Sequence, residues 1–468
     1  MVGKSTLNRR KFLRNTTLVA TGSIMVPNIV PASVIGKNPP SDKIQIAQIG
    51  FGRIARSHDL PETMKNDIAR VVAVCDVDTH RMNDGKKYIE GYYKEKMGDS
   101  GYMDVRTYQD YREMLEDKSI DAVIISTPDH WHAQPTIDSA LAGKDIYLQK
   151  PASLTIEEGR QMSDIVHRTG TVFQIGSQQR SVNPWPQFKK ACELVRNGRI
   201  GELKHIQVGL PGDPGGDEEP EMPIPTNLDY DMWLGSTPWK YYTEKRVHPH
   251  EGYSRPGWLR CEQFGAGMIT GWGAHHIDTA HWGMGTEFTG PVEIEGTAEF
   301  PKSGLWSVHG PFHIKSKYAN GVTMEVSGDF PNGVRFEGSD GWIFVTRGNV
   351  GVTASDPTSA NSEKSPFKAS DPKILTSVIG PDEIHLYESP EQHKNWLDCI
   401  KSRELTVAPA EVAHRSCSAC LVYHTAMKIP RKLYWDPVME RFKNDDEANA
   451  MLSRRQRYPW GTNYSLGK

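Results

Sequence analysis

A glycine-rich turn between a short apolar run and a helix-forming segment constrains the fold most. Residues 44–49 read IQIAQI, which has the length and composition of a buried strand. The run Gly50-Phe51-Gly52-Arg53-Ile54-Ala55 follows directly, and Asp76 closes the next apolar run. Gly50 permits a tight turn, Gly52 lets the backbone approach a pyrophosphate, and the helix N-terminus offers partial positive charge. This arrangement predicts a dinucleotide site, the alternative being a purely structural strand–turn–helix.

The acidic residue after the second run indicates which dinucleotide is bound. The carboxylate of Asp76 would accept hydrogen bonds from the adenosine ribose and would repel a 2′-phosphate. Arg53 lies next to Gly52 and partly offsets that repulsion. The expected cofactor is therefore NAD rather than NADP.

The order of strand-like and helix-like segments predicts two different sheets. Apolar runs at 70–75, 120–126 and 145–148 alternate with helix-like segments, which is typical of a doubly wound parallel sheet. From Thr171 onward strand-like runs dominate, which indicates an α+β domain with a large, mostly antiparallel, open-faced sheet. The expected divisions are 42–170 for the nucleotide domain, 171–435 for the sheet domain with its closing helices, and 436–468 for a C-terminal tail.

The first 35 residues resemble a twin-arginine export signal. Arg9-Arg10-Lys11-Phe12-Leu13 precedes a mildly apolar stretch at 18–34 that is broken by Thr, Gly and Pro. A basic tail on a cytoplasmic protein is the alternative. No cysteine precedes Cys75, so a lipoprotein anchor has no attachment point. We expect a periplasmic protein without a stable membrane anchor.

The charge balance excludes one class of partner. The chain has 55 Lys and Arg against 58 Asp and Glu, a formal net charge of −3. Nucleic-acid binding needs a basic surface, so no nucleic-acid partner is expected. No apolar run reaches 18 residues, which excludes a multi-span membrane protein.

Two further motifs follow predicted strands, at the edge of the sheet where ligands bind. They are Ser126-Thr127-Pro128-Asp129-His130-Trp131-His132 and Gln149-Lys150-Pro151. Together with the glycine turn they resemble the Gfo/Idh/MocA oxidoreductases, the glucose–fructose oxidoreductase and inositol dehydrogenase family, over about residues 43–430. The resemblance implies a Rossmann domain and an open-faced sheet domain, NAD(P) between them, a sugar or polyol over the nicotinamide, and a homodimer or homotetramer.

The resemblance also implies two catalytic residues, Lys150 and His275. Lys150 matches the lysine of the family's Glu-Lys-Pro motif, where a partly desolvated amine takes or relays a proton. Its neighbour is Gln149 in place of the glutamate, and Gly271 stands where the family has an aspartate. Asp278 lies three residues beyond His275 and is a candidate to orient the imidazole, with a structural role as the alternative.

The remaining site residues are expected to contact cofactor or substrate. The cofactor set is Gly50, Phe51, Gly52, Arg53, Ile54, Asp76, Ser126, Thr127, Pro128, His130, His132, Gln149, Lys150 and Gln178. The substrate set is Arg180, Tyr253, Arg255, Trp272, His276 and Asp278. No metal is expected, because the histidine spacing after residue 274 is not that of a ligand pair and hydride transfer to nicotinamide needs no metal.

These features lead to one principal hypothesis and two alternatives. The principal one is an exported NAD-dependent oxidoreductase that acts on a ring hydroxyl of a sugar or glycoside, at C3, with tightly bound cofactor. The first alternative is an NAD-retaining glycoside hydrolase that works by transient C3 oxidation, elimination and re-reduction. The second is a non-catalytic module that binds sugar and NAD.

Overall fold

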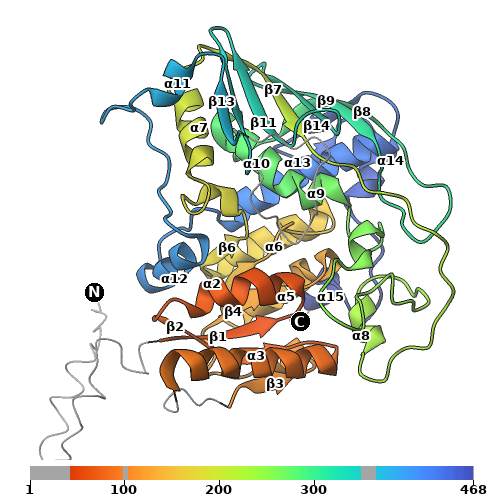
Figure 1. The fold of residues 1–468 in the computed structure, drawn as a ribbon. Coiled ribbons are helices and arrows are strands. Elements are labelled where there is room, and N and C mark those ends of the chain that lie inside the picture. The colour runs from red at the N-terminus through yellow and green to blue at the C-terminus, as the bar shows by residue number, and fades with distance from the viewer. Residues whose placement is uncertain (1–42, 99–103, 349–364, 467–468) are drawn as a thin grey trace, which may run out of the picture. The chain divides into compact units, whose positions relative to one another are not determined.

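The computed structural model describes residues 43–98, 104–348 and 365–466, and Figure 1 shows how their elements are arranged. Residues from Ile44 onward form one compact unit. The predicted export signal at 1–35 lies outside the described residues. Within the described ranges, no helix is both long enough and apolar enough to cross a bilayer.

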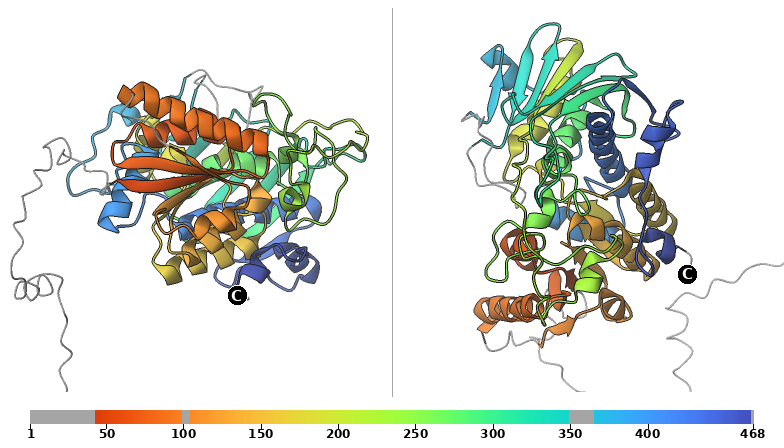
Figure 2. Two further views of the ribbon diagram at one scale, coloured as in Figure 1. Left: turned by 90° about the horizontal axis from the view of Figure 1, so that it is seen from below. Right: turned by 90° about the vertical axis from the view of Figure 1, so that its right-hand side faces the viewer.

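The first sheet is parallel throughout, as predicted. Its order is β3-β2-β1-β4-β5-β6, so the order reverses between β1 and β4, and ligands bind at such a switch point. Helices cover both faces (Figure 2, left). The strands are β1 Ile44–Ile49, β2 Ala69–Cys75, β3 Arg106–Tyr108, β4 Ala122–Ile125, β5 Asp145–Leu148 and β6 Phe173–Ile175, and the helices are α2 Leu60–Met64, α3 Thr79–Met97, α4 Tyr111–Leu115, α5 Ala133–Leu141 and α6 Ile156–Thr169.

The helix after the glycine turn begins in an unusual way. Residues Ala55–Asp59 form a π-helical turn before α2 continues from Leu60. Pro61 has no N–H and its ring crowds the preceding turn, so a regular ladder is unfavourable here, and wide turns of this kind are frequent at functional sites. The turn holds the Asp59 side chain in the interior, where it has no exposed surface.

The second sheet has nine strands in the order β13-β12-β11-β7-β10-β9-β8-β14-β15. Every neighbouring pair is antiparallel except β7 with β10, which confirms the predicted fold class. The strands are β7 Leu203–Gly209, β8 Pro291–Ala298, β9 Phe312–Tyr318, β10 Thr323–Ser327, β11 Gly333–Gly338, β12 Trp342–Val345, β13 Phe367–Ala369, β14 Leu433–Asp436 and β15 Arg441–Phe442.

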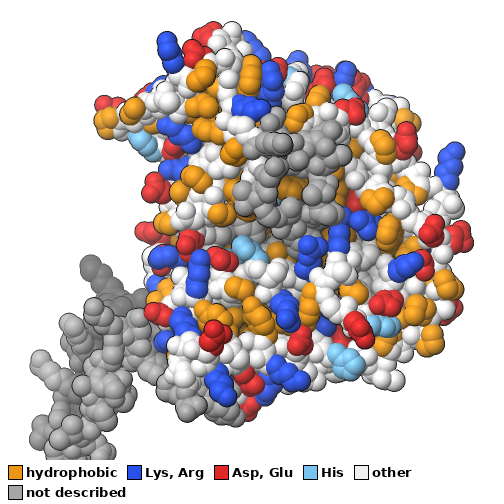
Figure 3. Space-filling model, in the orientation of Figure 1, with side chains coloured by type: hydrophobic (Ala, Val, Ile, Leu, Met, Phe, Trp, Pro, Cys, Tyr) orange, Lys and Arg blue, Asp and Glu red, His pale blue; other side chains and the backbone are white. Residues whose placement is uncertain are grey.

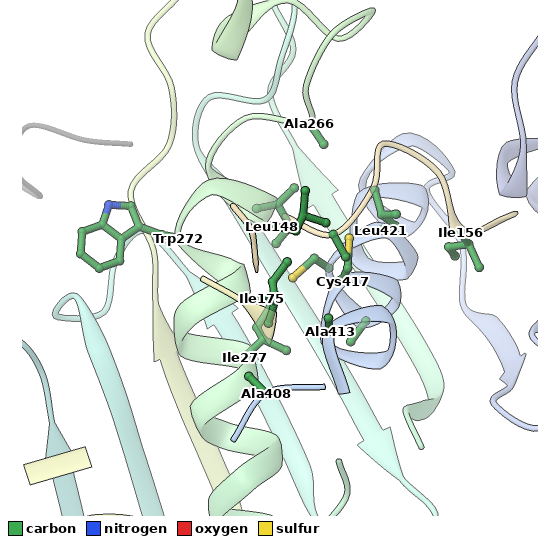
Figure 4. Packing of buried hydrophobic residues seen from close by; sticks show 14 of the residues in the cluster. Leu148, Ile156, Ile175, Ala266, Trp272, Ile277, Ala408, Ala413, Cys417 and Leu421 are labelled. Carbon is green, nitrogen blue, oxygen red and sulfur yellow. The ribbon is translucent and has the colours of Figure 1, made fainter. Parts of the chain in front are cut away.

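A layer of helices joins the two sheets (Figure 1). α10 (Gly273–Met284) packs on β7 and β11, and α13 (Ala410–Lys428) packs on β8, β6 and α6. Figure 4 shows Leu148, Ile175, Ile277 and Cys417 gathered between α10 and α13, while Trp272 lies apart. The other helices are α7 Pro186–Arg196, α8 Tyr230–Leu234, α9 Met268–Gly271, α11 Pro372–Thr376, α12 Gln392–Ser402, α14 Asp446–Asn449 and α15 Thr462–Ser465.

The outer face of the second sheet is polar. Glu295, Lys315 and Glu325 lie opposite one another on β8, β9 and β10 and are exposed or half-buried, which sets unlike charges side by side. Basic and acidic side chains are also interspersed on the face of the molecule in Figure 3.

The two sheets and their helices are less separate along the sequence than the predicted divisions at 170 and 435 imply. β6 adds a strand to the first sheet beyond residue 170, and Trp396 of α12 returns to the core around β1 and β2. Trp460, in the predicted tail, packs on Trp131 at a ring distance of 5.6 Å. Hydrophobic periodicity predicts the elements but not which sheet each one covers, so these boundaries shift.

Candidate functional site

An open cleft lies at the carboxyl ends of the first sheet and encloses about 1290 Å³ of empty space, mouth included. Its floor comes from β1, β2, β4 and β5, and its other wall comes from residues after the first sheet. Ten predicted cofactor residues line it: Gly50, Gly52, Arg53, Ile54, Asp76, Ser126, Thr127, Pro128, Gln149 and Lys150. The opposite wall includes Met232, Trp233, His248, Trp258 and Gly271.

The glycine turn fits a dinucleotide. Gly50 has φ +81°, and a Cβ there would lie 2.9 Å from the carbonyl oxygen of Ser126, so a side chain is excluded. Above Gly52 no atom lies within 4 Å of the corresponding Cβ position. The backbone is therefore open on the side where a pyrophosphate would approach. The Phe51 side chain is buried away from solvent, so this residue offers its backbone to the turn.

The carboxylate predicted to hold the ribose is fixed by the backbone. The N–H groups of Phe51 and Asp78 donate to Asp76 at 2.7 and 2.9 Å. Burial raises the pKa of Asp76, and these two hydrogen bonds partly offset the rise. A carboxylate has about four acceptor sites on its two oxygens, so Asp76 still has acceptor capacity toward the cleft. The residues present fit NAD.

Lys150 shares the cleft with a carboxyl group that sequence reasoning missed, Asp129. Burial lowers the pKa of Lys150 to about 8, and the Asp129 charge opposes that shift while Arg347 and Arg255 add to it. Burial raises the pKa of Asp129, and Lys150 opposes the rise. Gly271, which stands at the family's aspartate position, also lines the cleft. Asp129 thus supplies an acid beside the lysine, and its place directly after β4 was the available signal.

The Gln149 side chain hydrogen-bonds a carboxylate on another element, that of Asp59. Its amide donates to Asp59 Oδ1 at 2.7 Å, and Ser126 Oγ donates to Asp59 Oδ2 at 2.7 Å. His393 lies 3.4 Å from the same carboxylate. Burial alone would raise the pKa of Asp59, but His393, the charge of His58 and the hydrogen bond from Ser126 hold it below its ordinary value. Asp59, in the π-helical turn, therefore supplies the negative charge that a glutamate would have at position 149.

His275 is a buried imidazole whose ring makes no hydrogen bond. Its side chain is fully buried in α10 and does not line the cleft, and neither ring nitrogen has a partner among the described residues. Burial lowers its pKa well below the ordinary value, and the charges of Arg347 and Lys150 lower it further. A neutral imidazole with both nitrogens unused is suited to hydrogen-bond a ligand.

Three other histidines, which were predicted to contact cofactor or substrate, already have hydrogen-bond partners within the protein. His130 Nε2 lies 2.9 Å from the carbonyl oxygen of Trp233, and His132 Nε2 lies 2.9 Å from that of Thr127. His276 Nε2 lies 2.8 Å from Asn332 Oδ1. None of the three lines the cleft. These rings position loops, and the structure does not bring them to the cofactor or substrate.

Arg180 and Asp278 bind each other rather than the ligand or His275. Arg180 Nε and Nη2 donate to the Asp278 carboxylate at 2.7 and 2.8 Å, and Nη1 donates to Glu287 at 2.7 Å. Ser416 Oγ donates to Asp278 at 2.7 Å. The expectation that Asp278 orients the imidazole is therefore wrong, because its carboxylate pairs with a buried guanidinium and neither ring nitrogen of His275 has a hydrogen-bond partner among the described residues.

Replacing Arg180 should destabilise the fold. In Arg180→Ala the buried carboxylate of Asp278 and the half-buried one of Glu287 lose their partner, so we expect the free energy of unfolding to fall by about 3–5 kcal/mol. Urea denaturation followed by circular dichroism measures it. Arg335→Ala is the control, because Arg335 pairs with Glu337 at a half-exposed site and should cost less than about 1 kcal/mol. Equal losses in the two variants would contradict the assignment.

The remaining predicted residues do not line the cleft and have other contacts. The Tyr253 hydroxyl donates to Asp84 Oδ2 at 2.5 Å, and its ring lies 5.7 Å from that of Phe51, beside the nucleotide half of the cleft. Arg255 pairs with Asp213 at 3.3 Å. Trp272 stacks on His276. Gln178 is buried next to the Tyr147 hydroxyl.

The structure offers no built metal site within its described ranges: no three His, Cys, Asp or Glu side chains are grouped there to hold an ion. Cys417 and Cys420, which are spaced like a metal or redox pair, are buried free thiols in α13.

Comparisons with known proteins agree with this architecture. The family model "Oxidoreductase family, NAD-binding Rossmann fold" matches residues 44–177. The model "Oxidoreductase family, C-terminal alpha/beta domain" matches residues 214–350 and 367–462. Among solved structures, the WlbA dehydrogenase of Bordetella pertussis in complex with NADH and UDP-GlcNAcA has a TM-score of 0.57 at 14% identity, covering 84% of this chain and 99% of that one. The aldose-aldose oxidoreductase of Caulobacter crescentus has a TM-score of 0.54 at 16% identity, with coverage of 84% and 99%.

Relatives with higher identity match a shorter stretch. The chain is 29% identical over 215 residues to an α-N-acetylgalactosaminidase of Shewanella oneidensis, and 29% identical over 212 residues to a glycosyl hydrolase family 109 protein of Shewanella pealeana. Each alignment covers 42% of this chain, and the chain spans only 45% of the length of each relative. The two family models together match well over half of the chain, and it therefore belongs to the Gfo/Idh/MocA oxidoreductase family, with an NAD-binding Rossmann domain followed by the family's C-terminal α/β domain.

Proposed function

We propose that this protein oxidises a ring hydroxyl of a sugar or glycoside, at C3, with NAD as the oxidant. The observation that carries the proposal is that Lys150 and Asp129 line the same cleft as the glycine turn, where their charges act on each other. A buried lysine whose pKa is lowered toward neutrality is suited to proton transfer.

Lys150 and His275 divide the work on the hydroxyl group. Bound NAD⁺ would supply the hydride acceptor for the carbinol carbon, so that the alcohol would become a ketone and the hydroxyl proton would be left for the protein. Lys150, as the neutral amine, accepts that proton. The neutral imidazole of His275 hydrogen-bonds the substrate oxygen, and Asp129 stabilises the ammonium that Lys150 becomes.

A second candidate function is an NAD-retaining glycosidase, which the names of the Shewanella relatives favour. Here oxidation at C3 acidifies the C2 proton, the glycosidic substituent leaves by elimination, water adds, and the ketone is reduced again. The net reaction is hydrolysis and the cofactor is regenerated. A non-catalytic sugar- and NAD-binding module is disfavoured, because binding alone requires neither Lys150 nor His275.

One experiment separates the three. The protein with NAD is incubated with a panel of aryl glycosides, and absorbance near 340 nm and aglycone release are followed together. A rise near 340 nm without aglycone release supports the dehydrogenase, and aglycone release at constant cofactor level supports the glycosidase. No change of either kind across the panel would overturn both catalytic proposals.

The acid beside the lysine makes a pH-dependent prediction. Oxidation requires neutral Lys150, so kcat/KM should rise with pH through about 8. In Asp129→Asn the negative charge that favours the ammonium form of Lys150 is gone, so the midpoint of the pH profile should move to lower pH. Profiles between about pH 6 and 10 measure this, with Asp164→Asn on the exposed face of α6 as the control. An unchanged or higher midpoint would contradict the pairing.

We also propose that the protein is exported by the twin-arginine route to the periplasm and retains its NAD. The support is the run Arg9–Leu13 together with the dinucleotide site. Because the periplasm has no large NAD pool, retention requires slow release. An association rate of roughly 10⁶ M⁻¹s⁻¹ with sub-nanomolar affinity gives release below about 10⁻³ s⁻¹. Because even that rate empties a site in under about an hour, retention also requires loops that close over the cofactor.

Protein purified without added nucleotide should therefore contain close to one NAD(H) per chain. Denaturation followed by HPLC of the supernatant measures it. Fully apo protein that needs millimolar NAD would refute retention.

We propose further that the chain forms a homodimer or homotetramer through the polar outer face of the second sheet, as family members do.

A further inference from the structure

A loop from the second half of the chain crosses the nucleotide end of the cleft. We call residues 248–256 the strap; they lie between β7 and α9. Three residues of the strap line the cleft, namely His248, Ser254 and Pro256. Gly52 and Asp76 line the same cleft from the first sheet. A dinucleotide held at these two residues would therefore lie between the first sheet and the strap.

The first anchor of the strap lies beside the carboxylate predicted to bind the ribose. His248 Nε2 lies 3.0 Å from Asp78 Oδ2, and the Asp78 N–H donates to Asp76 Oδ1 at 2.9 Å. Burial alone would raise the pKa of Asp78, but the hydrogen bonds from His248 and Asn227 hold it at about 2. The acceptor of this anchor therefore stays charged at neutral pH, and it is bonded directly to the residue that would hold the ribose.

The second anchor, Tyr253, holds the strap against the glycine turn. Its hydroxyl donates to Asp84 Oδ2 at 2.5 Å, and its ring lies 5.7 Å from that of Phe51, the middle residue of the turn. The guanidinium carbons of Arg56 and Arg81 lie 4.8 and 4.7 Å from the centre of the same ring, where cations are attracted to the ring face. Both anchors thus rest on the elements that would hold the dinucleotide.

The strap is joined to the rest of the chain at a narrow base. A Cβ on Gly257 would overlap the carbonyl oxygen of Lys245, so the two ends of the loop pack backbone to backbone. Arg255 also pairs with Asp213 there, at 3.3 Å. Residues 250–252, at the tip, are exposed, and a groove of about 840 Å³, mouth included, separates the strap from α3. Surface loops whose ends lie together in this way are frequently functional.

The neighbouring wall at α8 is held more firmly. The side chains of Tyr230, Met232 and Trp233 are buried. Trp131 Nε1 donates to the carbonyl oxygen of Met232 at 2.9 Å, and His130 Nε2 lies 2.9 Å from that of Trp233. Segments with few buried apolar contacts open at the lowest cost in free energy. The strap is therefore the part of this wall that is able to move.

We propose that the strap is the barrier to NAD release, and that it must lift from Asp78 and Asp84 before the dinucleotide can leave. Opening of a loop, rather than the contacts of the cofactor itself, then limits the rate of release. His248 and Tyr253 set how often the strap opens. This inference rests on the proposed binding and retention of NAD, and it names the residues on which retention depends.

The test measures release of the dinucleotide with no sugar present. Protein loaded with NADH is mixed with excess NAD⁺, and the loss of energy transfer from tryptophan to NADH gives the release rate. Trp233 and Trp258 line the cleft and serve as donors. His248→Ala loses a hydrogen bond to a charged group, so release should be faster by about 10- to 100-fold. Tyr253→Phe loses only the contact with Asp84 and should accelerate release by about 3- to 10-fold.

The association rate distinguishes a barrier from a simple binding contact. A strap that blocks the exit also blocks the entrance, so binding should become faster in His248→Ala and in Tyr253→Phe, and Kd should change less than the release rate. Faster release at an unchanged association rate would mean that the two side chains contribute binding energy only, and it would overturn the barrier.

His250→Ala is the matched control, because His250 belongs to the same strap and lies two residues from His248. Its Nε2 lies 2.5 Å from the Tyr242 hydroxyl, and its backbone N–H donates to Glu244 at 2.7 Å. These contacts are with the base of the loop and not with the first sheet or its helices. Release from this variant should stay within about twofold of the wild type. His248→Gln, whose amide can still donate to Asp78, should restore most of the slow release.

The outcomes separate this inference from the proposed function. If the wild type shows no energy transfer to NADH, the dinucleotide site fails and both proposals fail with it. If NADH binds but His248→Ala and Tyr253→Phe release it at the wild-type rate, or if His250→Ala accelerates release as much as His248→Ala, only the strap inference fails. If His248→Ala does not fold, Tyr253→Phe and His248→Gln decide the matter. Sugar turnover has no part in these rates, so its absence would overturn the proposed oxidation alone.

Discussion

Lys150→Met should lower kcat for sugar oxidation by about 10³- to 10⁴-fold while the protein keeps its NAD. Methionine has nearly the same length and volume as lysine, so the cleft stays filled, but it cannot accept a proton. The amine is half-buried in the cleft that Asp129 also lines, and the Asp129 charge stabilises the ammonium that forms. No other described amine lines the cleft. Stopped-flow absorbance near 340 nm and the NAD content after denaturation measure the two quantities.

The matched control is Lys144→Met, at the opposite end of the same strand. Lys144 precedes β5 and Lys150 follows it, so the two amines lie at opposite edges of the first sheet. Lys144 is also buried, and its Nζ donates to the carbonyl oxygens of Asp117 and Ile120 at 2.8 Å. This variant should lose stability but keep its kcat. Near-wild-type kcat in Lys150→Met would refute the assignment of Lys150 as the proton acceptor.

The parts of the fold that could be predicted are those with local causes. The turn after Ile49 depends on the absence of a Cβ at Gly50, which a sequence shows directly. The alternation of apolar runs and helices predicts a parallel sheet, and the change after Thr171 predicts the antiparallel one. The cofactor half of the cleft follows from these local features, because the carboxyl ends of neighbouring parallel strands meet at one edge.

The parts that could not be predicted depend on partners far along the chain. Gln149 contacts Asp59 from 90 residues away, through a π-helical turn that no periodicity indicates. The i, i+3 spacing of His275 and Asp278 places both on neighbouring parts of one helix face, but it does not show that Arg180 competes for the carboxylate. Arg347 is separated by almost two hundred residues from the lysine it influences. Tertiary packing decides which charges pair in the interior, and the spacing of residues along the sequence does not show it.

His275→Ala and His276→Ala should affect two different properties. His275 makes no hydrogen bond within the described protein, so its removal costs stability only through lost packing, whereas kcat should fall by about 10²- to 10³-fold because the substrate oxygen loses its partner. His276 stacks on Trp272 and hydrogen-bonds Asn332. Its removal leaves a buried amide unpaired, so the free energy of unfolding should drop by about 1–3 kcal/mol while kcat changes little.

Neighbouring residues of the same type and burial make this pair a strict comparison. Both side chains are fully buried in α10 and both imidazoles are neutral, because burial lowers each pKa. Differences between the variants therefore reflect contacts rather than charge or depth. Urea denaturation gives the stability and single-turnover absorbance near 340 nm gives the rate of the chemical step. If His276→Ala lost the turnover and His275→Ala the stability, the family's histidine would be His276, and the orphaned nitrogens of His275 would have no catalytic meaning.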